Sequence, residues 1–156
     1  MLNSLRTLLR KASSAEYPAS SARIETTMHT STSADGTTIY RGLDISSSSY
    51  RWDSITAEHL GYWINRLPHL RTPFLTIAKP RPGVEHPEFV QTYWESGQEF
   101  TFEWWNYSRP GLHRVCTVRS AQRLVQLIHS WLDGDDSQLE SEQWAEEYFK
   151  VKIRKR

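Results

Sequence analysis

The chain has 156 residues, of which 38% are hydrophobic and 12% aromatic, and its formal net charge at pH 7 is +1. A chain of this length forms one domain of ordinary size, and it holds no apolar run near the roughly 20 residues that a membrane-spanning helix needs. Its one cysteine, Cys116, excludes an internal disulfide framework and a cysteine-based zinc site. These features together predict a cytoplasmic protein.

Charge is divided by position along the chain. The first 27 residues hold four basic residues against two acidic ones, and residues 150–156 hold five basic residues and no acidic one. The part between them contains 10 basic and 16 acidic residues, and residues 133–147 carry seven of these acids without a Lys or Arg. A negative surface attracts cationic partners and repels nucleic acid and anionic membranes. We therefore expect no nucleic acid and no membrane among the partners.

The chain divides into three parts. Residues 1–27 begin with leucines and arginines and continue in Ser, Ala and Pro, which predicts a flexible basic leader. Two other interpretations of this leader stay open, an organelle transit sequence and a start codon placed upstream of Met28. Residues 28–150 are expected to form a single α+β domain, and residues 151–156 a basic C-terminal tail.

The first half of the domain predicts two strands and one helix. Residues 38–46 have the apolar pattern of a strand, and a serine-rich loop follows. Residues 54–67 carry apolar side chains at helical spacing before a proline, with Ser54 or Thr56 as the N-terminal cap. Residues 73–79 are short, apolar and bounded by prolines, which predicts a second strand.

Residues 88–106 predict a β-hairpin around the turn Ser96-Gly97. A short connection there places Trp94 opposite Glu99 and sets the register of both strands. One face of the hairpin then gathers the side chains expected in the core, which are Phe89, Tyr93, Phe100, Phe102 and Trp104. The other face gathers a mixed set that is expected to be accessible, which is Val90, Thr92, Trp94, Glu99, Thr101, Glu103 and Trp105.

The last part of the domain predicts a third strand and a second helix. Residues 112–118 continue the antiparallel sheet, and Ser120 then caps a helix that ends at Gly134. Trp144 and Phe149 are expected to tie the following acidic stretch to the body. The whole pattern predicts an α+β fold, with an antiparallel sheet of four or five strands and two main helices packed on it.

No pattern of catalytic, metal-binding or cofactor-binding residues appears. The six histidines form no paired ligand motif, and the seven glycines form no phosphate-binding loop. His113 and Cys116 lie three apart on one predicted strand, so they point to opposite faces and cannot form a local catalytic pair. We therefore predict a protein without enzymatic activity, metal or cofactor.

The mixed face of the hairpin allows three interpretations. Glu99 and Glu103 could form a carboxylate pair for acid–base chemistry. Together with Trp94 and Trp105 they could instead recognise a cationic partner, because tryptophan is enriched among binding hot spots. In the third interpretation, both tryptophans lie beneath a helix or the leader.

From residue 89 to residue 149 the order is an aromatic hairpin, a third strand, a helix that ends in the sequence WLDGD (131–135), and an acidic stretch with spaced aromatics. This order resembles small α+β immunity proteins that are encoded beside bacterial polymorphic toxins. The resemblance implies a protein that blocks a toxin by binding it, and it carries over no functional residue. A scaffold domain with a non-toxin partner is the alternative.

The residues predicted to bind the partner follow from charge and aromatic character alone. A toxin that attacks nucleic acid has a basic cleft, which acidic side chains can occupy. The predicted set consists of the acidic stretch and the mixed hairpin face, namely Asp133, Asp135, Asp136, Glu140, Glu142, Glu146, Glu147, Glu99, Glu103, Trp94 and Trp105.

Overall fold

A computed structural model of the chain describes residues 27–106 and 112–146. These residues form a seven-stranded antiparallel sheet, a separate two-stranded hairpin, two main helices and two short helical turns. The sheet has the order β4-β3-β5-β6-β7-β8-β9. Its strands are β3 (Asp44–Ser47), β4 (Tyr50–Trp52), β5 (Phe74–Lys79), β6 (Glu88–Ser96), β7 (Glu99–Asn106), β8 (Leu112–Val118) and β9 (Ala145–Glu146). The predicted α+β class, the antiparallel sheet and the two main helices are confirmed.

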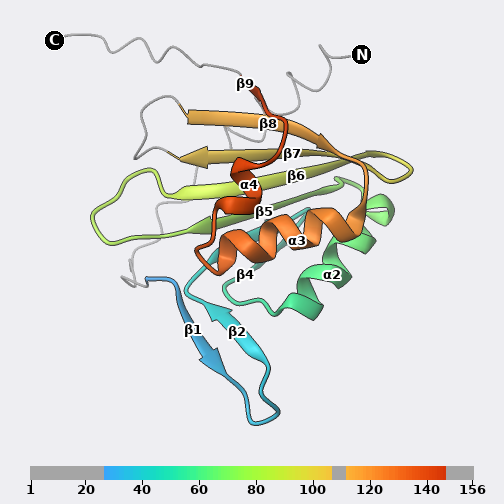
Figure 1. The fold of residues 1–156 in the computed structure, drawn as a ribbon. Helices are drawn as coiled ribbons and strands as arrows, with labels where there is room; N and C mark the ends of the chain where they lie inside the picture. The colour runs from blue at the N-terminus through green and yellow to red at the C-terminus, as the bar shows by residue number, and fades with distance from the viewer. Residues whose placement is uncertain (1–26, 107–111, 147–156) are drawn as a thin grey trace, which may run out of the picture.

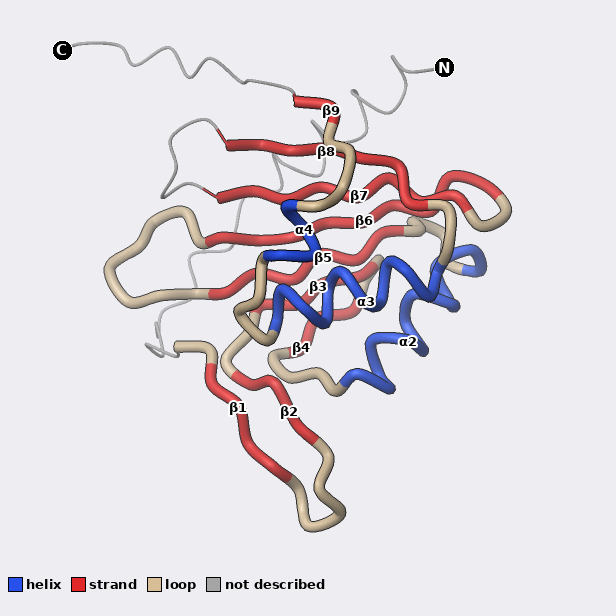
Figure 2. The backbone as a smooth tube through the Cα atoms, viewed as in Figure 1, coloured by secondary structure: helices blue, strands red, loops and turns tan. Residues whose placement is uncertain are grey.

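The main helices lie on the same face of the sheet (Figures 1 and 2). They are α2 (Ala57–Arg66), which continues into the 3-10 turn η1 (Leu67–His69), and α3 (Ala121–Leu132), which the short helix α4 (Ser137–Glu140) follows. The remaining two strands, β1 (His29–Thr32) and β2 (Thr38–Arg41), form a hairpin that extends away from the body (Figure 1).

Local capping chemistry sets the ends of both main helices. Thr56, rather than Ser54, caps α2, because its hydroxyl accepts a hydrogen bond from the backbone N–H of His59 at 3.1 Å. Ser120 caps α3 as predicted, with its hydroxyl 3.1 Å from the backbone nitrogen of Arg123. Beyond the end of α3, Gly134 has a φ of 77°, the left-handed conformation that commonly ends a helix.

The predicted number of four or five strands is wrong, because the sheet also contains β4 and β9. The first predicted strand is moreover divided into β2, in the separate hairpin, and β3, in the sheet. Gly42 separates β2 from β3 with a φ of 70°, and a side chain there would lie 2.7 Å from the backbone oxygen of Thr27. A second turn at Ser48 then returns the chain into β4, which the sequence pattern did not predict. The two-residue strand β9 is too short to leave a periodic signal.

The predicted register of the β6–β7 hairpin is also wrong, by one residue. A bulge between Trp94 and Ser96 leaves Glu95 unpaired and places Trp94 opposite Phe100. Because side chains alternate with a period of two, this shift reverses the predicted faces of β6. Val90 and Thr92 are therefore buried towards the helices. The side chains on the opposite face of β6 are Phe89, Gln91, Tyr93 and Glu95.

The core lies between the sheet and the helices, and one carboxylate joins the two layers. Its largest fully buried side chains include Trp104 on β7 and Trp131 on α3. Both indole nitrogens donate to the same oxygen of Glu88, at 2.9 and 2.7 Å. Trp144 packs against this core as predicted, whereas Phe149 lies outside the described residues. In the described residues, no helix combines the length and the apolar character needed to span a membrane.

Candidate functional site

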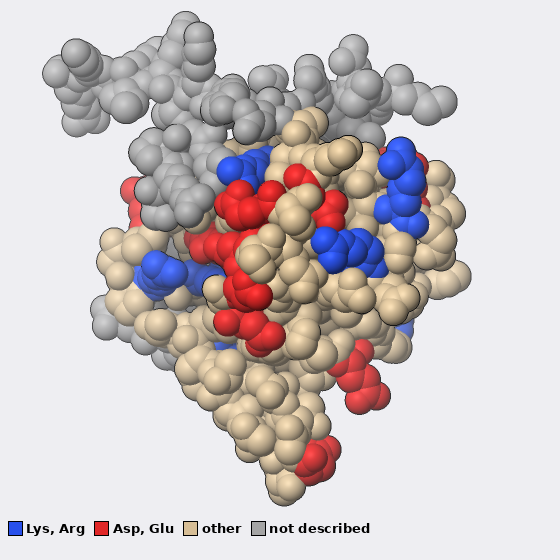
Figure 3. All heavy atoms as spheres, viewed as in Figure 1, with Lys and Arg blue, Asp and Glu red and all other residues tan. Residues whose placement is uncertain are grey.

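Acidic side chains gather where α3 ends and α4 begins. Figure 3 shows them as a band over α4 and past the end of α3, with basic side chains beside it. We define the acidic band by five of the predicted residues, Asp133, Asp135, Asp136, Glu140 and Glu142. Of the other two acids in the stretch, Glu146 lies in β9, where its backbone pairs with Arg114, and Glu147 lies outside the described residues.

The two glutamates of the acidic band are paired with arginines of the body. Glu140 accepts a hydrogen bond from Arg114 of β8 at 2.6 Å. Glu142 accepts two from Arg123 of α3, at 2.8 and 2.6 Å. Both pairs tie the segment after α3 to the sheet and to α3. Because each glutamate charge is offset by a neighbouring guanidinium group, the glutamates contribute little to the negative field of the band.

Two aspartates of the band, Asp133 and Asp135, accept hydrogen bonds from uncharged groups. The buried Tyr40 donates its hydroxyl to Asp133, and the exposed Asp135 accepts from the backbone N–H of Ser137 at 3.0 Å. Hydrogen bonds from Ser137 lower the pKa of Asp135, so this carboxylate keeps its charge well below neutral pH. Asp136 directly precedes α4. Because uncharged donors leave the charge of a carboxylate in place, Asp133 and Asp135 contribute to the negative field of the band.

One lysine lies beneath the acidic band. Lys79 donates from Nζ to the backbone oxygen of Trp131, near the end of α3, and its Nζ lies 4.0 Å from the centre of the Trp131 indole ring. A cation is favourable there because the helix C-terminus carries partial negative charge. Burial lowers the pKa of Lys79, while Glu88 and Asp136 act in the opposite direction. Lys79 thus stabilises the end of α3 and offsets part of the field of the band.

The second predicted surface is not a single surface. Trp94 lies on the helix side of the sheet, packs against the core and donates its indole N–H to the backbone oxygen of Gly97 at 3.0 Å. Glu103 and Trp105 project from the opposite face, where Glu103 is only 5% exposed. Glu99 is half-exposed, and its carboxylate lies 3.8 Å from Arg119. The grouping of these four residues was wrong because it depended on the incorrect hairpin register.

On the sheet face opposite the helices, three rings stack across three strands. Phe89, Trp105 and His113 are cross-strand neighbours, with ring centres 5.4 and 3.6 Å apart. Glu103 accepts from the indole nitrogen of Trp105 at 3.0 Å, and Nε2 of His113 lies 3.1 Å from the same oxygen. The stack therefore shields a carboxylate–imidazole pair. Sequence reasoning missed it, because only the correct register brings these residues together.

A second aromatic cluster on α2 and β4 was also missed. Tyr50 and Tyr62 are 49% and 53% exposed, and their ring centres lie 5.4 and 5.9 Å from that of the buried Trp63. Trp63 stacks in turn on Trp52 at 4.7 Å. Arg66 lies over the rings of Tyr62 and Trp63 at 5.7 and 5.9 Å. The helical spacing of Trp63 predicts a core position, which the structure confirms. No local pattern marks the two tyrosines as its neighbours.

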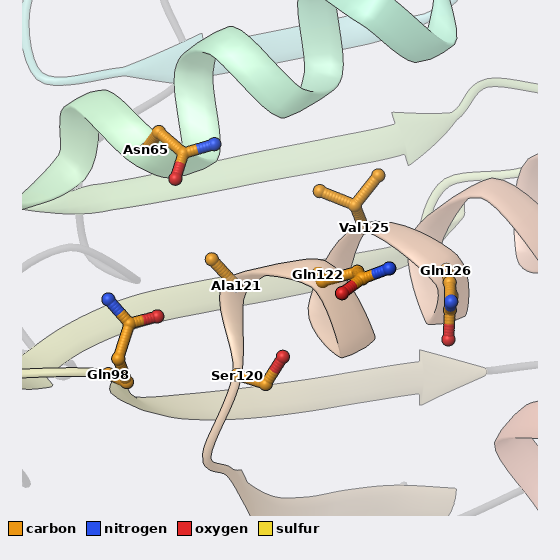
Figure 4. Close-up of a pocket in the computed structure, with 7 residues that line it drawn as sticks. All are labelled: Asn65, Gln98, Ser120, Ala121, Gln122, Val125 and Gln126. Atoms are coloured by element: carbon orange, nitrogen blue, oxygen red, sulfur yellow. The ribbon is translucent and has the colours of Figure 1, made fainter.

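An open hollow of about 620 Å³ lies at the start of α3. Figure 4 shows its lining, which comes from α2, from the turn between β6 and β7, and from α3 with its cap, namely Asn65, Gln98, Ser120, Ala121, Gln122, Val125 and Gln126. These side chains are neutral, so the hollow offers hydrogen bonds but no acid–base group. Within the described part of the chain, no group of three His, Cys, Asp or Glu side chains is placed to hold a metal ion.

Comparison of the chain with protein-family models, with curated proteins and with solved structures finds no match. The functional argument therefore depends on the geometry and charge of the described residues.

Proposed function

We propose that this protein is an immunity-type protein, which binds a cognate protein toxin and neutralises it by occupying a basic substrate cleft. The observation that carries this proposal is the aspartate cluster of the acidic band, Asp133, Asp135 and Asp136, at the junction of α3 and α4. The resemblance to immunity proteins in the order of elements supports the same class. Binding, and not chemistry, is then the activity of the protein.

Clustered negative charge favours fast association with a cationic protein. Complementary fields steer two proteins together and raise the association rate, and salt screens this effect. Asp133 and Asp135 are suited to this role because they accept hydrogen bonds from uncharged groups, the Tyr40 hydroxyl and the Ser137 N–H. Glu140 and Glu142 instead pair with arginines. In a complex, the aspartates would face the basic groups that otherwise hold an anionic substrate.

The aspartate cluster is also held in place before any partner arrives. The buried Tyr40 fixes Asp133, and the turn at Ser137 fixes Asp135. The arginine pairs of Glu140 and Glu142 hold the segment that follows. Because ordering side chains and loops on binding costs free energy, a fixed cluster binds more tightly than a mobile one with the same charge.

The test is a calorimetric titration of this protein with the product of the adjacent gene, at about 50 mM and about 300 mM salt. The variant replaces the cluster by Asp133→Asn, Asp135→Asn and Asp136→Asn, which keeps an acceptor oxygen at each position. A matched control removes the same charge from exposed residues elsewhere, by Asp53→Asn, Glu58→Gln and Glu85→Gln.

We expect the cluster variant to lose affinity by at least about tenfold at low salt, with a smaller loss at high salt. The control variant should bind within about threefold of the unmodified protein. Equal losses in the two variants would mean that only net charge matters. An affinity that changes neither with salt nor with the aspartate substitutions would contradict the proposal. So would the absence of binding to the neighbouring gene product.

A further inference from the structure

The β1–β2 hairpin stands apart from the main sheet. It extends from the body as an arm (Figure 1), and the described residues give it no third strand. Its attachment to the body includes a two-residue bridge between Tyr40 and Ile55, with both hydrogen bonds at 2.9 Å. A two-stranded hairpin is marginally stable by itself in water. A further strand on its free edge would supply the missing support.

The register shows which backbone groups point to that free edge. Ser33 donates to the backbone oxygen of Thr37 at 3.0 Å, so this pair faces inward. Inward and outward pairs alternate along an antiparallel ladder. The backbone N–H and C=O groups of Thr32 and Thr38 therefore point out of the hairpin. Those of Ser31 and its partner point into it, and those of Thr30 and its partner point out again. Tyr40 is the partner of Thr30, and its backbone groups do point outward, where they form the two hydrogen bonds to Ile55. This agrees with the alternation.

Strand β1 thus presents the N–H and C=O groups of Thr30 and Thr32 on one edge. The described part of the chain provides no hydrogen-bond partner for these four groups on that edge. An unpaired edge of this kind is a template for another strand. The side chains of residues 30 to 32 are Thr, Ser and Thr, so β1 itself carries no charge on this edge. Arg41 of the neighbouring strand β2 donates from Nε to the Ser31 hydroxyl at 2.9 Å.

We propose that the hairpin is a dimerisation arm, in which β1 pairs antiparallel with β1 of a second copy about a two-fold axis at Ser31. This inference goes beyond the proposed function and does not depend on it. With the axis at that position, Thr30 of each copy lies opposite Thr32 of the other. The backbone N–H and C=O groups of both residues point to the free edge, so each opposed pair exchanges two main-chain hydrogen bonds.

A second copy fits this edge because the edge is complementary to itself. A symmetric dimer uses the same patch on both chains, and here the two outward residues are identical in type and equally distant from the axis. Cross-strand threonine pairs add to the stability of a sheet. The result is a four-stranded sheet in place of two separate hairpins, each of which is only marginally stable by itself in water. The contact is small, so the dimer should be weak and concentration-dependent.

The first test measures the oligomeric state by analytical ultracentrifugation, up to about 1 mM protein. Thr32→Pro removes an outward N–H from the free edge of β1, and proline is tolerated on edge strands. Thr38→Pro is the matched control, because it changes the cross-strand partner in the same hairpin but removes an N–H from the other edge. We expect reversible dimerisation that Thr32→Pro weakens by at least about tenfold and Thr38→Pro by less than about twofold.

The second test uses a disulfide to read the register. At the axis, the two Ser31 residues form a non-hydrogen-bonded pair with Cα atoms about 4.5 Å apart, within the range for a disulfide. Ser31→Cys should therefore cross-link dimers under mild oxidation. In Thr30→Cys the two cysteines are displaced by two residues and lie about 8 Å apart, beyond that range. We expect cross-linking in the first variant only, while the buried Cys116 stays reduced in both.

Three results would overturn the proposal. One is a protein that stays monomeric at about 1 mM. Another is a dimer that Thr32→Pro and Thr38→Pro affect equally. The third is cross-linking that is as efficient through Thr30→Cys as through Ser31→Cys, which would show contact without this register. None of these measurements involves the toxin, so their failure is distinct from a failure of the proposed function.

Discussion

Tyr40 and Asp133 are joined by a hydrogen bond across 93 residues of sequence. The tyrosine belongs to β2, at the base of the hairpin, and its ring is 1% exposed. The aspartate follows the end of α3 and belongs to the acidic band. His129 lies beside both, with its ring edge-on to Tyr40 at 5.9 Å. One contact therefore connects the arm, the helix layer and the aspartate cluster.

Removal of the Tyr40 hydroxyl should destabilise the protein. Tyr40→Phe leaves the buried ring in place and deletes one hydrogen bond to a carboxylate. We expect the free energy of unfolding to fall by about 1–2 kcal/mol, measured by urea denaturation. Tyr50→Phe is the control, because its ring is about half exposed, and it should change stability by less than about 0.5 kcal/mol. Equal effects would show that the Tyr40–Asp133 bond contributes no stability.

Glu88 should be the most sensitive carboxylate among the described residues. Its side chain accepts from the indole nitrogens of Trp104 and Trp131, and it opposes Lys79 across the sheet. Glu88→Ala leaves two indole donors without this acceptor and removes the negative charge opposite Lys79. We expect a loss of about 3–5 kcal/mol in unfolding free energy, by urea or thermal denaturation.

Glu88→Gln separates hydrogen bonding from charge. The amide keeps an acceptor oxygen for the indoles but removes the negative charge beside Lys79. We expect about half of the loss seen with Glu88→Ala, because buried donors then stay paired. If Gln and Ala cost the same, the charge on Glu88 matters and the indole bonds do not.

Short-range chemistry explains what could be predicted from the sequence. Ser120 and Gly134 bound a helix through hydrogen bonds and backbone conformations within a few residues of themselves, so their pattern is readable along the chain. The bulge at Glu95 has no comparable signal. One extra residue there reversed the faces of β6, and it separated Trp94 from Trp105 in the candidate surface.

The sequence also could not show which of the acids pair with arginines. Residues 133–147 hold seven acidic residues and no Lys or Arg. Arg114 of β8 nevertheless pairs with Glu140, and Arg123 at the start of α3 pairs with Glu142. These pairs form only when the chain folds. The structure therefore divides the acids of this stretch into two kinds. Arginines offset the charges of Glu140 and Glu142, whereas Asp133 and Asp135 accept hydrogen bonds from uncharged groups.

The Arg123–Glu142 pair should hold the segment after α3 locally rather than stabilise the whole fold. Both side chains are partly exposed, at 34% and 23%, so water screens much of their attraction. Glu142→Gln should increase amide hydrogen exchange in residues 137–146 by at least about threefold, while the unfolding free energy changes by less than about 1 kcal/mol. Glu58→Gln, on the exposed face of α2, should leave exchange in that segment unchanged. Unaltered exchange in Glu142→Gln would rule out this role.

Cys116 should make the protein less stable as the pH rises above 9. Burial raises the pKa of this thiol from 9.0 to about 12. Below pH 9 the thiol is protonated in both states, so it adds no pH dependence. Above pH 9 the unfolded chain loses the proton and the folded protein keeps it, so the unfolded state gains free energy of ionisation that the folded state does not.

This contribution can be isolated by removing the thiol. In Cys116→Ala, the plot of unfolding free energy against pH should be flatter between pH 9 and 10, by up to about 1.4 kcal/mol per pH unit. That window lies below the ordinary tyrosine pKa of 10.0, where Tyr40, whose pKa burial also raises, adds a loss of the same sign. The control Thr117→Ala changes an exposed neighbour on β8 and should run parallel to the unmodified protein. If Cys116→Ala also runs parallel, the thiol ionises equally in both states and is not shielded by the fold.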